Sequence, residues 1–287
     1  MKVPNFSLDS ASVLSAPNNS PAINPAELRQ LALQWFVHDD PVTKAQALMQ
    51  TPAGLEVDAQ RELNSPSPQP GRRALPLLVP HTQIKPAKLH TPEGHAALVH
   101  SVVHIERNAI DLALDVVWRF SGMPEDFYRA WFQVAQEEAL HFSLLSEHLQ
   151  TLGFGYGDFP AHDGLWEMAE RTQNDLLARV ALVPRTLEAR GLDASPAVKK
   201  KLLSVGDLRG AEILDLILRD EVGHVALGNR WYAHLCQQRG LEPVATFAQL
   251  RQQYQAPRMK GPFNLPARRA AGFSEAELQA LLTMAQD

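Results

Sequence analysis

Two segments of the chain, 137–141 and 220–224, repeat an acidic-acidic-x-x-His pattern. In each, a glutamate and the histidine three positions later lie one helical turn apart, on the same face of a helix. A single glutamate precedes each pair at a similar offset, 32 residues in one case and 33 in the other. The six candidate ligands are Glu106, Glu138, His141, Glu188, Glu221 and His224. Two Glu-x-x-His pairs and two single glutamates, one group per helix of a four-helix bundle, are the ligand set of a site for two iron or manganese ions.

The glutamates stand at the centre of apolar stripes on their helices. Residues three, four and seven positions before and after Glu106 are all apolar, and Glu138 and Glu221 have nearly the same surroundings. Such stripes face the core of a globular protein. Ionised carboxylates taken out of water cost several kcal/mol each and repel one another, whereas two divalent cations would neutralise four of them. The alternative, surface glutamates beside two packed histidines, does not account for the stripes.

The first acid of each repeated segment is expected to lie outside the ligand set. Glu137 has the polar Gln133 one helical turn behind it, so we expect its side chain to point away from the ligands. Asp220 is expected to bind and orient either an arginine or one of the ligand histidines without binding the metal itself.

Glu188 has the weakest support among the six. It lies three residues before Gly191, near the expected helix end, whereas the other three glutamates are near the middle of their helices. Either the third helix continues past Gly191 or the bundle is staggered. Pro184 must kink this helix or open its backbone hydrogen bonding. The competing carboxylates on the same segment are Glu167, Glu170 and Asp175.

Four long helices are expected to carry the ligands, over about 91–120, 125–151, 163–191 and 207–239. Thr91-Pro92 gives the first a capping hydroxyl and a proline at the first helical position. The short turn before the second makes these two an antiparallel hairpin. The 13 residues from Leu152 to Gly164 can extend about 43 Å, about the length of a 28-residue helix, and are expected to form a crossover. Ser195-Pro196 is expected to cap a separate short helix before the fourth.

The whole chain is therefore predicted to be all-α and to divide into three parts. Residues 1–90 form a segment that packs on the bundle, with an irregular leader at 1–24, short helices at 25–38 and 41–50, and an extended proline-rich run at 65–92. Residues 91–240 form the four-helix bundle. Residues 241–287 form a C-terminal helix and an extended strap, and a capping box from Ser274 to Glu277 opens a last short helix.

Composition narrows the classes of function. The 287 residues carry a net charge of −5, which gives no overall attraction to nucleic acid or to an anionic membrane. The single Cys236 suits a reducing compartment, and the start of the chain carries no apolar signal core. The apolar stretch at 96–118 is interrupted by charged residues and is not expected to span a membrane. We therefore expect a cytoplasmic protein.

Three further features have two interpretations each. His95 lies about three turns before Glu106 on a similar face, although lone helical histidines are usually capping or packing residues. The loop 156–163 joins aromatic and ionisable groups and is either a substrate-side lid or a packed crossover loop. The basic tail at 258–269 either binds an anionic group of a substrate or is a solvated strap over the bundle.

Together with the six candidate ligands, the phrases at 104–115, 156–169 and 220–226 resemble a known group of proteins. They are similar to the ferritin-like di-iron carboxylate superfamily and, more narrowly, to a bacterial ferritin-like family catalogued as a domain of unknown function. The resemblance covers roughly residues 80–270 and implies a ferritin-like four-helix bundle with a di-metal site, but no established reaction. The superfamily includes iron-storing cages, rubrerythrins, manganese catalases, ribonucleotide reductase radical subunits and hydroxylases. Because the chain has one cysteine, it lacks the ligands for the rubredoxin-type iron centre of a full rubrerythrin.

The expected function is that of a di-metal carboxylate protein, an oxidoreductase that activates dioxygen or peroxide on an unknown small-molecule or anionic substrate. Two iron ions or manganese ions are the expected cofactors, with zinc as a further alternative. Two other classes stay open: a metal-handling or ferroxidase protein, and a structural or partner-binding protein whose metals hold the bundle. The long terminal segments would cover faces that a storage cage needs, so we expect a monomer or a small homo-oligomer.

Overall fold

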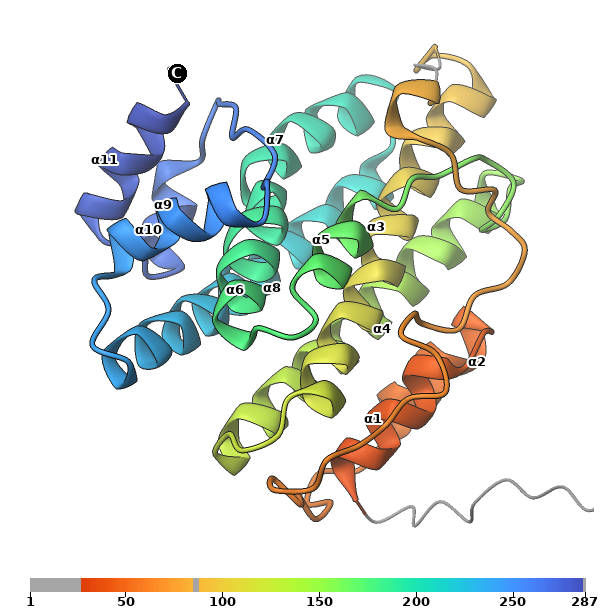
Figure 1. The fold of residues 1–287 in the computed structure, drawn as a ribbon. Coiled ribbons are helices and arrows are strands. Elements are labelled where there is room, and N and C mark those ends of the chain that lie inside the picture. Colours follow the sequence, from red (N-terminus) through yellow and green to blue (C-terminus); the bar gives the residue numbers. More distant parts are fainter. Residues whose placement is uncertain (1–26, 85–87, 286–287) are drawn as a thin grey trace, which may run out of the picture.

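A computed structural model describes residues 27–84 and 88–285 (Figure 1). Within them the chain is all-α and forms no β-strand. The predicted irregular leader at 1–24 lies outside the described residues. In chain order the helices are α1 (Leu28–Val37), α2 (Pro41–Gln50), the 3-10 helix η1 (His81–Gln83), α3 (Pro92–Arg119), α4 (Glu125–Thr151), α5 (Gly164–Arg171), α6 (Leu176–Leu182), the π-helix η2 (Val183–Glu188), α7 (Ala189–Ser204), α8 (Leu208–Gln238), α9 (Pro243–Gln253), α10 (Leu265–Ala270) and α11 (Glu275–Met284).

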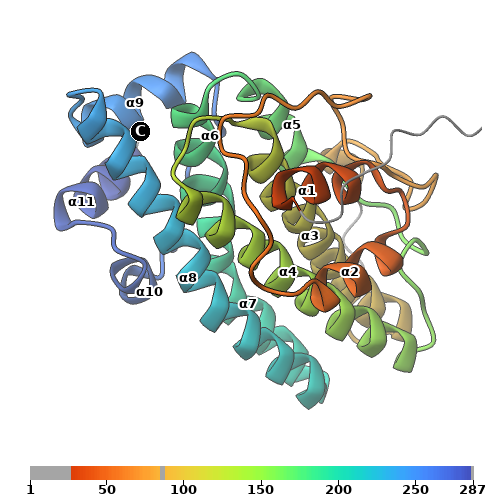
Figure 2. The same ribbon diagram turned by 90° about the horizontal axis from the view of Figure 1, so that it is seen from below.

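Three long helices, α3, α4 and α8, pack side by side with the composite helix α6–η2–α7 (Figures 1 and 2). Caps set the starts of α3 and α8: the expected cap Thr91 accepts from the Gly94 amide through its hydroxyl, and Asp207 accepts from the Gly210 amide. The start of α8 lies beside the end of α4, where Asp207 contacts His148. Because α7 also ends beside Asp207, α6–η2–α7 runs antiparallel to α8. The loop 152–163 and α5 therefore cross from one end of the bundle to the other.

The third helix differs from the continuous helix expected over 163–191. It breaks after α5, and Asp175 caps α6 by accepting from the Ala178 amide. Pro184 lies in the π-helix η2, because a proline cannot donate the α-helical hydrogen bond and displaces the preceding turn. The helix then continues through Gly191 and Pro196 to Ser204, so the expected separate short helix after Gly191 was wrong. Packing of this stretch against α8 outweighs the cost of the proline.

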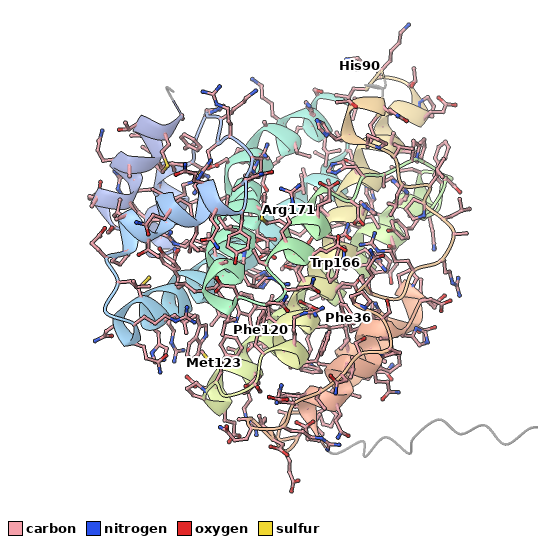
Figure 3. The ribbon with its side chains drawn as sticks, viewed as in Figure 1. Phe36, His90, Phe120, Met123, Trp166 and Arg171 are labelled. Atoms are coloured by element: carbon pink, nitrogen blue, oxygen red, sulfur yellow. The ribbon has the colours of Figure 1, made fainter. Side chains whose placement is uncertain are left out.

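The terminal segments lie on opposite sides of the bundle (Figures 1 and 2). Helices α1 and α2 cover α4 and α3, and Phe36 packs its ring 5.6 Å from the ring of Trp166 (Figure 3). On the other side, α9 to α11 pack near α6 and α8. The expected extended strap at 258–269 is wrong in part, because Asn264 caps α10 and a proline stands in its first turn. The capping box at Ser274 is present as expected.

Arg29 of α1 ties the N-terminal segment to the end of α3. Its guanidinium is fully buried and donates to the carbonyls of Val117 at 3.1 Å, Trp118 at 2.9 Å and Asp58 at 2.8 Å. Carbonyl groups near a helix end lack partners within the helix, so the arginine satisfies them.

Among the described residues, none of the helices is long and apolar enough to cross a membrane.

Replacing Arg29 by methionine should lower the free energy of unfolding by about 2 kcal/mol, because buried carbonyls lose a charged donor while most of the aliphatic packing is kept. Urea unfolding followed by circular dichroism measures this. Arg129→Met is the matched control, since Arg129 makes an exposed ion pair with Glu125 and such pairs contribute about 0.5 kcal/mol or less. Equal losses from the two variants would contradict the anchoring role.

Candidate metal centre

Five of the six predicted ligands converge in the bundle interior. Glu106, Glu138 and His141 form one group, and Glu138, Glu221 and His224 form a second. Within each group the potential ligand atoms all lie within 4.8 Å of one another. The five side chains come from α3, α4 and α8, and all are buried. Each helix presents its ligands from the apolar stripe that packs against the others, which is why residues far apart in the chain meet here.

Glu138 stands between the two groups. Its Oε2 lies 3.3 Å from Nδ1 of His141, and its Oε1 lies 2.9 Å from Nδ1 of His224. His141 Nδ1 is also 3.3 Å from Oε2 of Glu106. The two imidazole rings have centroids 6.0 Å apart. One carboxylate thus faces two imidazoles with its two oxygens, which is the arrangement of a carboxylate that bridges two ions.

The outer nitrogens of the two histidines bind carboxylates of the opposite segment. Nε2 of His141 lies 3.1 Å from Oδ2 of Asp220, and Nε2 of His224 lies 2.7 Å from Oε2 of Glu137. With an ion bound, each Nε2 would donate its proton to this outer carboxylate, which leaves the Nδ1 lone pair to bind the ion. The first acid of each repeated segment therefore orients the histidine of the other segment. The histidine contact expected for Asp220 is present. The side chain of Glu137 was expected to point away from the ligands, and its contact with His224 corrects that expectation.

Glu188 is the last residue of η2 and is partly buried beside this cluster. Burial and the negative charge of Glu138 raise its pKa to about 8. It does not join either group of converging ligand atoms. Its sequence competitors are accounted for elsewhere: Glu167 and Glu170 are exposed, and Asp175 caps α6. Among the candidate carboxylates of this segment, Glu188 is therefore the one whose pKa responds to the charges of the centre.

Burial disturbs the protonation of the whole cluster. It raises the pKa of Glu106 to about 7, with the charge of Glu138 adding to the effect, and it raises the pKa of Glu221 for the same two reasons. Burial would also raise the pKa of Glu138, but His224 and His141 hold it below its usual range. Burial would lower the pKa of His141, yet the adjacent carboxylates of Glu106 and Glu138 raise it to about 11. Without a cation to balance them, burial and mutual repulsion thus favour the protonated forms of Glu106 and Glu221.

Several polar atoms in the cluster make no aligned hydrogen bond although they are buried: Glu106 Oε2, Glu221 Oε2 and His224 Nδ1. Buried polar atoms without partners are rare in folded proteins. These three point to the same interior region as Glu138. Because each of these atoms can donate a lone pair to a metal ion, the residues present fit a metal centre. Carboxylate oxygens with two imidazoles suit iron or manganese, and zinc also accepts this donor set.

The other features identified in the sequence lie outside the centre. The loop 156–163 is packed against α3: the Tyr156 hydroxyl lies 2.8 Å from Nδ1 of His104, and the Gly157 amide donates to Nε2 of His100. In the basic tail, Arg268 is fully buried and pairs with Asp193 at 2.6 Å. His95 lies near the start of α3 and contacts Asp207. These contacts favour the packed loop over the lid and give Arg268 a structural partner.

Comparison with known proteins gives a family. The family model described as "Protein of unknown function (DUF455)" matches residues 37–279. An "Uncharacterized protein" of Haemophilus influenzae is 47% identical over 218 residues, which cover 74% of this chain and 76% of that protein. No solved structure shows a significant match.

Proposed function

The chain belongs to the DUF455 family, and we propose that it is a ferritin-like di-metal carboxylate oxidoreductase that activates dioxygen or peroxide. The observation that carries the proposal is the convergence of two Glu-x-x-His pairs on buried donor atoms without hydrogen-bond partners. A purely structural cluster of acids would be expected to satisfy these atoms with arginine, lysine or backbone amides. The immediate partners of the inner oxygens are instead two imidazoles.

The donor set divides between two ions. Glu106 and His141 would hold one ion, Glu221 and His224 the other, and Glu138 would bridge them. With ions bound, Glu188 would supply the fourth negative charge from η2. When bound, iron or manganese ions supply redox equivalents and Lewis acidity to an oxidant. The chain itself excludes bulk water by burial, and Asp220 and Glu137 hold the histidine protons on the outer Nε2 atoms.

The choice of an oxidoreductase over a metal store rests on two observations. Five side chains converge here with Glu188 beside them, and so few protein groups leave positions on two ions for an exogenous molecule. In addition, the terminal segments pack along two sides of the bundle, and such coverage leaves less of its surface for a closed cage. A ferroxidase that only oxidises and releases iron uses the same kind of site and is the second candidate.

Aerobic iron loading should stop at about two ions per chain, and the protein should stay a monomer or small oligomer. Size-exclusion chromatography with iron analysis measures both, after anaerobic reconstitution with Fe(II) and exposure to dioxygen. Sustained consumption of oxidant should require an added reductant or substrate. A large assembly that takes up tens of irons per chain would favour storage, and less than one ion per chain after reconstitution with either iron or manganese would contradict the di-metal centre.

A further inference from the structure

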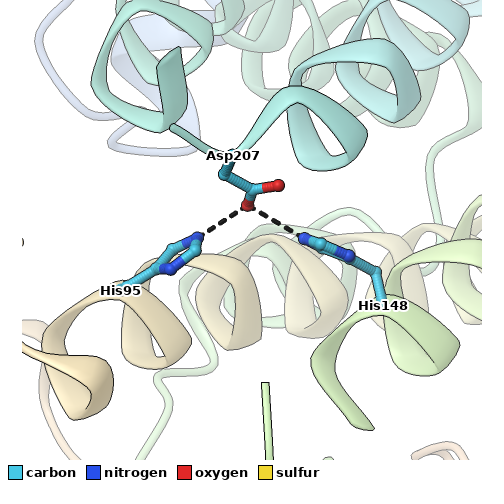
Figure 4. A group of neighbouring side chains, drawn as sticks. All are labelled: His95, His148 and Asp207. Atoms are coloured by element: carbon cyan, nitrogen blue, oxygen red, sulfur yellow. Dashed lines mark hydrogen bonds and ion pairs between the residues drawn. The ribbon is translucent and has the colours of Figure 1, made fainter. Parts of the chain in front are cut away.

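A third group of potential metal ligands, shown in Figure 4, lies at one end of the bundle. His95 stands in the first turn of α3, His148 in the last turn of α4, and Asp207 at the cap of α8. These three residues come from the three long helices, and their ligand atoms lie within 4.8 Å of one another. Neither repeated segment contributes to this group.

The two imidazoles converge on one oxygen atom. Nε2 of His95 lies 2.6 Å from Oδ2 of Asp207, and Nε2 of His148 lies 2.9 Å from the same oxygen. The other oxygen, Oδ1, accepts from the amide of Gly210 at 2.7 Å and so caps α8. The cap fixes the direction of the carboxylate, and its second oxygen is left to face both histidines.

This group is separate from the carboxylate centre. His148 follows Glu138 by ten residues on α4, and Asp207 precedes Glu221 by fourteen residues along α8. At 1.5 Å per residue these spacings correspond to about 15 Å and about 21 Å along the helices. An ion held by one group therefore shares no ligand with the other.

We propose that His95, His148 and Asp207 form a mononuclear site for a divalent transition-metal ion of the zinc type. Two imidazole nitrogens and one carboxylate oxygen are a donor set that zinc takes up with water in the remaining position. The side chains of Asp207 and His148 are 3% and 6% exposed, whereas that of His95 is 17% exposed. The site is thus mostly dry and opens to solvent on the side of His95, where a water ligand can enter.

Capping of α8 by Asp207 alone does not explain why two histidines converge on the same carboxylate. Capping α8 requires only Oδ1 of Asp207, and neither histidine contributes to that bond. The positive ends of α3 and α8 disfavour a cation here, but the negative end of α4 opposes them and the charge of Asp207 lies closer to the site. The ion would join the turn before α8 to α3 and α4, and its effect would be a zinc-dependent gain in stability.

Zinc titration of metal-free protein tests the site, with binding followed by calorimetry and thermal unfolding. The variant is His95→Gln, which keeps a donor toward Asp207 and leaves the cap of α8 intact. The matched control is His90→Gln, because His90 is an exposed histidine just before the same helix. His141→Ala reports separately on the carboxylate centre.

Wild type, His90→Gln and His141→Ala should all bind a zinc ion at this site. His95→Gln should lack this ion or bind it at least about 10-fold more weakly. The zinc-dependent rise in melting temperature that belongs to this site should disappear in His95→Gln, while its metal-free melting temperature stays close to that of wild type. Glu138→Ala weakens both ions of the carboxylate centre. In this variant, cobalt substitution should give the visible absorption of the site at His95, and the double variant with His95→Gln should lack that absorption. Identical zinc stoichiometry, affinity and stabilisation in wild type and His95→Gln would overturn the site.

Discussion

Glu138→Ala should reduce bound iron from about two ions per chain to well below one. Among the described residues, Glu138 is the only one that belongs to both groups of converging ligand atoms in the carboxylate centre. Removing it deletes one ligand from each ion and leaves the remaining acids with less compensation for their repulsion. Iron analysis after anaerobic reconstitution and desalting measures the effect.

Glu147→Ala is the matched control, because Glu147 is an exposed glutamate on the same helix. It should bind iron like wild type. Glu106→Ala and Glu221→Ala should each weaken mainly one of the two ions, since each carboxylate belongs to a single group. Full iron occupancy in Glu138→Ala, with the fold intact by circular dichroism, would contradict the bridging role.

Helix starts could be predicted from the sequence where a capping residue directly precedes the helix. Thr91-Pro92 and Asp207 are caps, and the starts of α3 and α8 follow them directly. The apolar stripes also carried enough information to bring Glu106, Glu138 and Glu221 together, because stripe centres of packed helices face one another. Local signals therefore gave both the long helices and most of the cluster.

The third helix shows where local signals end. Pro196 and Gly191 are helix-breaking residues in isolation, yet α7 passes through both. Leu192 and Ala189 are fully buried in this stretch, so tertiary packing decides its conformation. The π-helix at Pro184 likewise shifts the phase of Glu188. A period of 3.6 residues cannot predict such a shift, which is why the position of Glu188 stayed open.

Glu137 shows a different limit of the stripe argument. Apolar neighbours in the sequence indicate which side chains lie in the core. The side chain of Glu137 is 35% exposed and does not lie there. Its carboxylate nevertheless reaches across to His224 on α8. The available signal was the duplication itself: both segments have an acid directly before the central glutamate. Because the two segments are antiparallel in the bundle, each of these acids lies next to the histidine of the other.

Glu137→Gln and Asp220→Asn should each weaken metal binding by about 10- to 100-fold, and the double variant by about 10²- to 10⁴-fold. The amide keeps the shape of each side chain but is a weaker acceptor for the imidazole N–H, so the tautomer with Nδ1 facing inward is less favoured. The two single effects should be nearly additive, because each acid orients a different histidine.

Competition with a metal-binding dye measures these affinities, with Glu147→Gln as the control for removal of one negative charge from α4. The expected difference between Glu137→Gln and Glu147→Gln isolates the hydrogen bond from the loss of charge. Both acids are partly exposed, so the variants should fold, and a loss of affinity reports on the centre rather than on stability. Equal affinity in Glu137→Gln and the control would mean that His224 is held in place by packing alone, and the crossed pairing of acids and histidines would then have no part in metal binding.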